Sequence, residues 1–249
     1  MKFTVMASGS SGNCYVLEGR DSALIIECGV RPEVVFRKTA VIPSRVAGCL
    51  ITHEHKDHAG FAARWAGMQT PVYASGGTLF NIEMPRHARV VKLEPMVSCQ
   101  VGKFLVRPFR VEHDAAEPMG FLIEHPEAGR ILFVTDTPAV RYNFRDWRPD
   151  HIIVEANYDD DLLDDRTLSG DVSPVRATRV RRTHMSLRSA CEFIKANETP
   201  ALKTVTLIHL SDENSNAEYF ADKASKTALF ATIRVATPGL SFDMNSREI

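Results

Sequence analysis

The sequence predicts an α/β domain with β-sheets inside and helices outside. Short β-rich segments occur in two groups along the chain, each group is followed by helical patterns, and no long linker, low-complexity tract or short repeat interrupts them. The chain has 249 residues, of which 44% are hydrophobic and 24% charged. This is an average globular composition, and it excludes disorder and collagen-like structure. We therefore expect one large domain over residues 1–249.

The first group of segments contains strands that alternate with two helical patterns. We expect strands at residues 2–6, 14–17, 23–26 and 48–52. A short helix is expected at residues 32–38, because proline is tolerated in a first helical turn. A second helix is expected from residue 58 to 68, since Phe61, Trp65 and Met68 follow at i, i+4 and i+7.

The second group is richer in strands and ends in two helices. Strands are expected at residues 103–110, 119–124, 130–135, 151–155, 205–208 and 233–236. The acidic residues between 159 and 165 predict an exposed loop. One helix should begin after Ser186, and the last helix, around residues 217–224, should be capped by Ser215 or Asn216.

Charge and cysteine content narrow the class of protein. Thirty basic and 31 acidic residues give a net charge of −1, which argues against a wholly basic protein that coats nucleic acid but not against a local basic groove. Five widely spaced cysteines without a CxxC pair argue against a disulfide framework. No signal peptide and no apolar run near ~18 residues is found. We expect a cytoplasmic protein without membrane contact.

Histidines gather in one segment, HEHKDH at residues 53–58. Nine histidines in the chain predict only ~0.2 in a six-residue window, so a merely solvated turn is a poor explanation. If the strand's period of two continues, His53 and His55 point to the same side and reach one ion. Asp57 and His58 then enter the helix and face a second ion. Imidazole and carboxylate ligands without thiolate suit Zn, Mn or Fe.

Three further candidate ligands follow apolar strands elsewhere in the chain. These residues are His113 in EHDAAEP, Asp136 in FVTDTP and His209 in LIHLSDEN. Functional side chains often lie just beyond strand ends. Each residue taken alone is equally well explained as an ordinary polar loop residue, but together with HEHKDH the set is large enough for two ions.

In this order, HxHxDH followed by a lone His, a lone Asp and a final His resembles the metallo-β-lactamase superfamily. The resemblance extends over nearly the whole chain and is narrower to the YycJ-like branch, a group of small single-domain hydrolases regarded as nucleases and related to the β-CASP enzymes. The supporting segments are SGSSGNCYVL, HDAAEPMGF, VTDT, VEANYD, THMS and HLSDEN. The resemblance implies an αββα sandwich, in which helices flank two mixed β-sheets, without an inserted cap domain.

The resemblance also implies a role for each candidate ligand. The first metal would be held by His53, His55 and His113, and the second by Asp57, His58 and His209, with Asp136 as the bridge. Two positions depart from the family pattern. Glu27 stands where an Asp usually organises the site, which puts its hydrogen bonds in question, and Tyr158 stands where the branch tends to have His.

Other residues are candidates for catalysis and substrate binding. By resemblance to β-CASP motifs, His184 would contact a phosphate oxygen or protonate a leaving oxygen, and Glu155 would orient it; the alternative is an ordinary strand end and helix cap. The loop containing Ser10, Ser11 and Asn13 offers backbone N–H groups to an anion, or is only a glycine-rich turn. An arginine group lies directly before His184 and is either a set of phosphate contacts or a solvated charge run: Arg176, Arg179, Arg181 and Arg182.

Together these observations predict a hydrolase with two divalent ions, Zn or Mn with Fe as an option, that cleaves phosphodiester bonds. The substrate is expected to be DNA or RNA, attacked by a metal-bridging hydroxide, with Asp57, Asp136, His184 and Glu155 as catalytic residues. The main alternative is a small-molecule metallohydrolase acting on a cyclic phosphodiester, thioester or lactone. A diiron redox protein would need an electron-carrying domain, and a non-catalytic binding module would be expected to have lost ligands. The oligomeric state and the direction of cleavage are not determined by the sequence.

Overall fold

The computed structural model describes residues 1–244, whose strands fall into two mixed sheets of seven strands each. The chain divides into two compact units. The first unit contains Met1–Arg110, Ala115–Gly129 and the segment from Thr237 onward. The second contains Val111–Asp114 and Arg130–Ala236. Among the described residues, the helices are all too short or too polar to cross a lipid bilayer.

The first sheet lies in the first unit, in the order β14-β1-β2-β3-β4-β5-β6. Its first half is antiparallel, with β1 paired to β14 and to β2, and β2 to β3. From β3 to β6 the strands run parallel. Their bounds are Lys2–Ala7 (β1), Cys14–Glu18 (β2), Ala23–Ile26 (β3), Val46–Leu50 (β4), Val72–Ser75 (β5), Val90–Leu93 (β6) and Ser241–Asp243 (β14).

The helices of the first unit are short and pack on this sheet. Trp65, with no exposed surface, lies in the same buried cluster as Val16, Ile25 and Cys49 of the sheet. Three antiparallel strands complete the unit: β7 (Cys99–Val101), β8 (Phe104–Arg110) and β9 (Met119–His125). The helices are α1 (Pro32–Lys38), α2 (Lys56–Ala59), α3 (Ala62–Gly67) and α4 (Gly76–Asn81), with a 3₁₀ turn at Pro43–Arg45.

The helix predicted at residues 58–68 is two helices, α2 and α3. The N–H of Gly60 still bonds the carbonyl of Lys56, but the N–H of Phe61 donates to the carbonyl of Cys28 at 2.9 Å. This bond to a distant residue replaces the helical one, so the chain bends at Phe61. The prediction of one continuous helix was wrong because a tertiary hydrogen bond competes with the local pattern.

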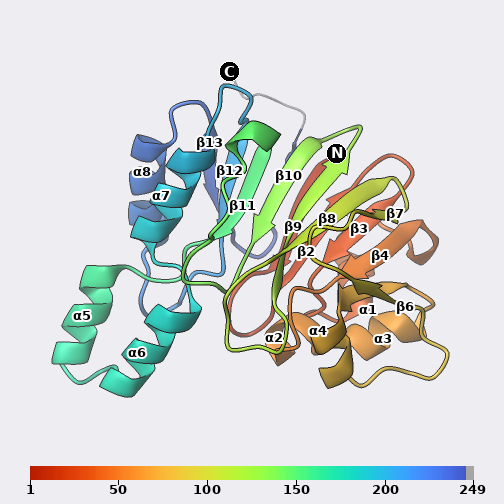
Figure 1. The fold of residues 1–249 in the computed structure, drawn as a ribbon, viewed down its shortest axis with the longest axis horizontal. Helices are drawn as coiled ribbons and strands as arrows, with labels where there is room; N and C mark the ends of the chain where they lie inside the picture. Colours follow the sequence, from red (N-terminus) through yellow and green to blue (C-terminus); the bar gives the residue numbers. More distant parts are fainter. Residues whose placement is uncertain (245–249) are drawn as a thin grey trace. The chain divides into compact units, whose positions relative to one another are not determined.

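The second unit contains four parallel strands covered by two helices. Strands β10 (Gly129–Val134), β11 (His151–Glu155), β12 (Thr204–Ile208) and β13 (Thr232–Val235) pair in chain order. Helix α7 (Leu187–Asn197) contacts β11, and α8 (Ala217–Thr227) contacts β13 and α7 (Figure 1). Both predicted caps are present, since Ser186 accepts the N–H of Ser189 and Asn216 accepts that of Tyr219.

A helical hairpin stands between β11 and α7. Helices α5 (Asp160–Leu168) and α6 (Pro174–Thr183) lie side by side (Figure 1). They share a small apolar cluster of their own, which consists of Tyr158, Leu163, Val172 and Ala177. A 3₁₀ turn at Arg145–Trp147 also belongs to this unit.

The loop predicted for the acidic stretch is therefore wrong, because residues 160–168 form α5. Asp159 caps this helix by accepting the N–H of Leu162, and two more acidic residues fill its first turn. Carboxylates in a first turn stabilise a helix through its dipole. Only Leu163 of this helix is buried, so the sequence carries almost no amphipathic signal there.

The backbone around Asp57 is held by close contacts between three segments. The N–H of Asn13 donates to the carbonyl of Asp57 at 2.7 Å, and the N–H of Gly29 donates to the carbonyl of Asn13 at 2.9 Å. A Cβ atom added at Gly29 would collide with the backbone of both Asp57 and Asn13. Only glycine permits this approach.

We predict that Gly29→Ala lowers the free energy of unfolding by at least about 2 kcal/mol, because backbone atoms cannot move aside as a flexible side chain can. Equilibrium unfolding in urea measures this change. Gly67→Ala is the matched control, since an added Cβ in α3 meets nothing within 4 Å. The control should change stability by no more than about 1 kcal/mol, toward greater stability. Equal effects of the two substitutions would contradict the prediction.

Candidate functional site

The HEHKDH segment follows β4 in the first unit and brings its histidines together. His53 is 1% exposed and His58 is fully buried. The ring of His53 lies with its centroid 4.6 Å from that of His55 and 4.1 Å from that of His58. The Nδ1 atom of His53 lies 2.9 Å from the hydroxyl of Thr52. The predicted clustering of these side chains is therefore present within this unit.

His58 is oriented by carboxylates on both sides of its ring. Its Nδ1 lies 3.4 Å from Oε1 of Glu27, and its Nε2 lies 3.2 Å from Oδ2 of Asp57. A hydrogen on Nδ1 faces the buried Glu27 carboxylate, which leaves the lone pair of the ring on Nε2. A carboxylate behind a histidine fixes the tautomer in this way in many metal sites.

Glu27 answers the question raised by its departure from the family pattern. Its backbone is left-handed, with φ 68°, directly after β3. This conformation lets the longer side chain stay fully buried while it contacts His58 and accepts the N–H of Thr52 at 3.4 Å. Burial raises the pKa of the Glu27 carboxyl against the lowering effect of His58.

The loop at residues 9–13 joins β1 to β2, and its members lie differently. Ser10 and Ser11 are exposed, whereas Asn13 is fully buried. The side-chain nitrogen of Asn13 lies 3.3 Å from Oδ2 of Asp57 and 3.1 Å from Nε2 of His58. The structure therefore brings Asn13, which the sequence assigned to substrate, beside two predicted metal ligands.

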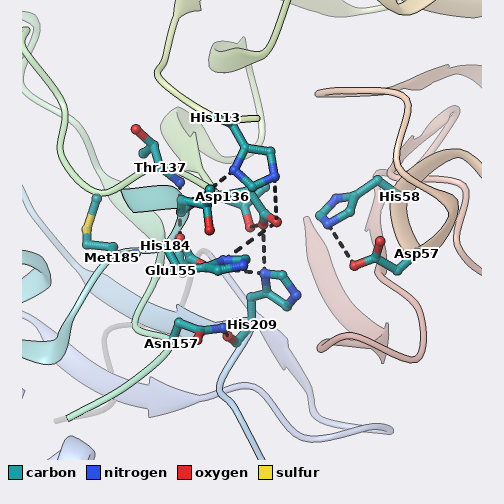
Figure 2. Close-up of polar contacts among 12 residues, drawn as sticks. Asp57, His58, His113, Asp136, Thr137, Glu155, Asn157, His184, Met185 and His209 are labelled. Carbon is teal, nitrogen blue, oxygen red and sulfur yellow. Dashed lines mark hydrogen bonds and ion pairs between the residues drawn. The ribbon is translucent and has the colours of Figure 1, made fainter. Parts of the chain in front are cut away.

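A second cluster lies at the ends of the parallel strands of the second unit (Figure 2). Single donor atoms of Asp136, Glu155, His184 and His209 all lie within 4.8 Å of one another. Asp136, after β10, and His209, after β12, have left-handed backbones with φ 49° and 55°. Both residues are 2% exposed. Such backbone conformations are costly for non-glycine residues and are common at functional sites.

His209 is held between two buried carboxylates. Its Nδ1 lies 2.7 Å from Oδ1 of Asp136 and 3.2 Å from Oε1 of Glu155 (Figure 2). Burial alone lowers the pKa of an imidazole, but these carboxylates outweigh it and raise the pKa of His209 to about 10. The protein without metal therefore balances this concentration of negative charge with a proton.

Glu155 and His184 form a close pair in the same cluster. Nδ1 of His184 lies 2.7 Å from Oε1 of Glu155, and Oε2 of Glu155 accepts the N–H groups of Met185 and Thr137. Burial lowers the pKa of His184, yet the Glu155 carboxylate more than reverses this and raises it. Burial likewise raises the pKa of Glu155, and His184 reverses this and lowers it. The predicted partnership of these two residues is thus present as a contact.

His113 is fixed by the backbone at the end of α6. Its Nδ1 lies 2.9 Å from the carbonyl oxygen of Thr183, so Nδ1 carries the hydrogen and Nε2 the lone pair. Nε2 lies 3.6 Å from Oδ2 of Asp136 and 3.2 Å from Oδ1 of Asp114. Burial lowers the pKa of His113, which keeps the ring neutral, as a metal ligand must be.

The arginines of α6 line a groove of about 960 Å³ that also contains His113. Arg179, Arg181 and Arg182 face this groove. Arg179 pairs with Asp114 at 3.0 Å and Arg181 with Asp164 at 2.6 Å. Arg176 is outside the lining and pairs with Glu213 at 3.2 Å. Both readings of the arginine group thus have support: ion pairs are present, and a basic groove is present.

Several supporting residues were not identified from the sequence. Asn157 donates to the carbonyl of His209 at 2.9 Å, and so fixes the chain where it turns after β12. Glu54 accepts the N–H of Ala116 at 2.7 Å. Asn157 stands two residues after Glu155, at a strand end, and this position was the available signal. Nothing in the sequence indicates the pairing of Glu54 with a loop about 60 residues away.

The donors in both units fit divalent metal ions. They are imidazole nitrogens and carboxylate oxygens, and hydrogen bonds or carboxylates behind His58 and His113 direct their Nε2 atoms outward. No thiolate belongs to either cluster, which matches the expectation of Zn, Mn or Fe chemistry and excludes a cysteine-bound structural zinc.

Comparison with protein families defines the class. The model of the β-lactamase superfamily domain matches residues 31–210, and the chain belongs to this superfamily. Among curated proteins, it is 28% identical over 233 residues to the exodeoxyribonuclease WalJ of Streptococcus pneumoniae, covering 87% of this chain and 84% of the relative. It is 29% identical over 174 residues to the exodeoxyribonuclease YycJ of Bacillus anthracis, covering 66% and 65%. The predicted family is confirmed.

Solved structures confirm the predicted fold class. The metallo-β-lactamase fold protein YhfI from Bacillus subtilis matches with a TM-score of 0.75 at 14% identity, covering 97% of this chain and 98% of the other. The short form of human tRNase Z matches with a TM-score of 0.64 at 18% identity, over the full length of both chains. Two mixed sheets with flanking helices are therefore the fold of this family and of this chain.

We predict that Glu155→Gln lowers the pKa of His184 in the metal-free protein, because it removes the carboxylate that stabilises the imidazolium. Titration of the imidazole by NMR measures this change. One oxygen remains to accept the N–H groups of Thr137 and Met185, so the fold should persist. Glu198→Gln is the control: Glu198 is 6% exposed and accepts the N–H of Phe230. An unchanged His184 pKa in Glu155→Gln would contradict the pairing.

Proposed function

We propose that the protein is a nuclease that depends on divalent metal ions and cleaves phosphodiester bonds in DNA or RNA. The observation that carries this proposal is the cluster of Asp136, Glu155, His184 and His209 at the ends of three parallel strands, in a chain similar to two exodeoxyribonucleases. DNA is the favoured substrate on the strength of those relatives. The cytoplasm is the expected compartment.

The proposed ligand set follows the order of the motifs along the chain and membership of the family. The first ion would be held by His53, His55 and His113, and the second by Asp57, His58 and His209. Asp136 would bridge the two ions. These residues come from both units, and the proposal that they act together rests on the family pattern. Zn and Mn are the favoured metals, with Fe as an option.

Two bound divalent ions would lower the pKa of water toward neutrality and neutralise the phosphate oxygens as charge develops. The residues of the chain would do the remaining work. Asp57 and Asp136 would steady the attacking oxygen. His184 would give its proton to the leaving oxygen, and Glu155, at 2.7 Å from Nδ1, would keep that imidazole charged and oriented.

The substrate contacts are proposed on both sides of this chemistry. Arg181 and Arg182, with Arg179, would bind phosphates along the groove of the second unit. The exposed hydroxyls of Ser10 and Ser11 and the imidazole of His184 would contact the scissile phosphate. Asn13 is proposed to act differently, as argued below. The rival function is a small-molecule metallohydrolase, for which the ion pairs of Arg179 and Arg181 would be purely structural.

The proposed function is tested by incubating the pure protein with Mn²⁺ or Zn²⁺ and labelled single- and double-stranded DNA and RNA. Bis(p-nitrophenyl) phosphate, thioester and lactone substrates belong in the same panel. Metal-dependent shortening of a polynucleotide is the expected result. Hydrolysis of a thioester or lactone without any phosphodiester cleavage would overturn the proposal in favour of the rival.

We expect Asp57→Ala to reduce turnover by at least about 100-fold, because it removes both a proposed ligand and an orienting carboxylate. The side chain of Asp57 is 23% exposed and fills no core cavity, so the free energy of unfolding of the metal-free protein should change by no more than about 1 kcal/mol. Steady-state kinetics and urea unfolding measure the two effects. A large loss of stability with a matching loss of activity would show that Asp57 is structural.

A second variant addresses the substrate class. Replacing Arg179 and Arg182 by Ala should flatten the salt dependence of polynucleotide binding, because each phosphate contact contributes ~0.7–0.9 log units per decade of salt. Hydrolysis of a small phosphodiester should fall less than that of a long substrate. Arg166→Ala with Arg176→Ala is the control pair, since both arginines lie beside Glu213 and outside the groove lining. Equal losses on long and short substrates would favour the small-molecule alternative.

A further inference from the structure

The backbone of Asn13 is fixed within the first unit. Its N–H donates to the carbonyl of Asp57 at 2.7 Å, and its carbonyl accepts the N–H of Gly29 at 2.9 Å. The side chain has no exposed surface. Asn13 therefore cannot reach solvent or a large substrate, and its amide acts where it lies.

The oxygen of the amide has a structural role that sets which way the group points. Oδ1 accepts the N–H of Gly9 at 2.9 Å and the hydroxyl of Tyr15 at 3.2 Å. Both partners are donors in this arrangement, so the oxygen must face them. The nitrogen consequently faces the opposite side, toward Asp57 and His58.

Three acceptors surround the nitrogen of the amide, which has two hydrogens. Nδ2 lies 3.1 Å from the carbonyl of Gly9, 3.3 Å from Oδ2 of Asp57 and 3.1 Å from Nε2 of His58. The imidazole nitrogen has a single lone pair. If that lone pair binds an ion, two oxygen acceptors remain for two N–H groups. The amide is then matched to its surroundings without any movement.

The distance between the two neighbouring ligand atoms also suits one ion. Oδ2 of Asp57 and Nε2 of His58 are 3.2 Å apart. Two ligands at Zn–N and Zn–O distances of ~2.0–2.1 Å in tetrahedral geometry lie ~3.3 Å apart. Asn13 touches both atoms, and Glu27 supports His58 from behind at 3.4 Å.

We propose that Asn13 is a positioning residue for the ion that Asp57 and His58 bind, and that it acts by donating a hydrogen bond to the Asp57 carboxylate. The proposal rests on the metal-binding part of the proposed function. It assigns the last residue of the GSSGN loop to the metal site rather than to substrate. The loop is then the means by which β1 and β2 hold the Asp57 carboxylate in place.

The test measures stepwise Zn²⁺ binding to the full chain by competition with a chromophoric chelator. In Asn13→Ala, one of the two dissociation constants should rise ~10-fold or more, as is typical when a hydrogen-bond partner of a ligand is removed. The other constant should stay within about two-fold. The visible absorption of the Co²⁺-loaded protein should change for one ion only. If Asn13→Ala does not fold, Asn13→Ser is measured in the same way.

Tyr15→Phe is the matched control, because it removes the bond to Oδ1 and leaves the nitrogen in place. It should leave both constants unchanged. The proposal is overturned if the folded Asn13 variant keeps both wild-type constants, if both rise by the same factor, or if Tyr15→Phe reproduces the loss. Because the readout is metal binding, a chain that binds two ions but cleaves no phosphodiester would refute the nuclease activity alone.

Discussion

A carboxylate without solvent contact sets the arrangement of the second unit. Glu155 ends β11 and is fully buried, so each of its oxygens must be hydrogen-bonded or paired with charge. The partners that satisfy it come from the turn after β10, the end of α6 and the residue before α7, namely Thr137, His184 and Met185. Three connections that are free in the sequence are thereby tied to one point. The same contacts place His184 where its proton is useful.

The first unit meets an equivalent requirement with a different set of groups. Glu27 is also fully buried, and it faces a histidine ring and a backbone N–H. In both units, a glutamate at a strand end stands behind an imidazole. The chemistry of the proposed ligands is thus prepared by buried groups that would not themselves bind an ion. A buried acid paired in this way is destabilising to break from either side.

The strands and the histidine motif were predictable because their signals are local. Residues 32–38 form the helix that a proline in the first turn indicates, and β11 coincides with the apolar run at residues 151–155. Strands β5 and β6 were missed, as were α4 and β14, since these segments are short. The break at Phe61 depends on the carbonyl of Cys28, which no local pattern contains. Asn13 was assigned to substrate because its contacts with Asp57 and His58 are likewise non-local.

The left-handed backbones at Glu27, Asp136 and His209 bear on how this chain can be engineered. Each such conformation costs of the order of 1–3 kcal/mol for a non-glycine residue. Substitution by glycine or asparagine would relieve that strain, so a selection for thermal stability alone would favour it at these three positions. Each replacement would remove an acid or an imidazole from the site. Stabilising libraries for this scaffold should therefore hold these three positions constant, because the most favourable changes there lead to an inert protein.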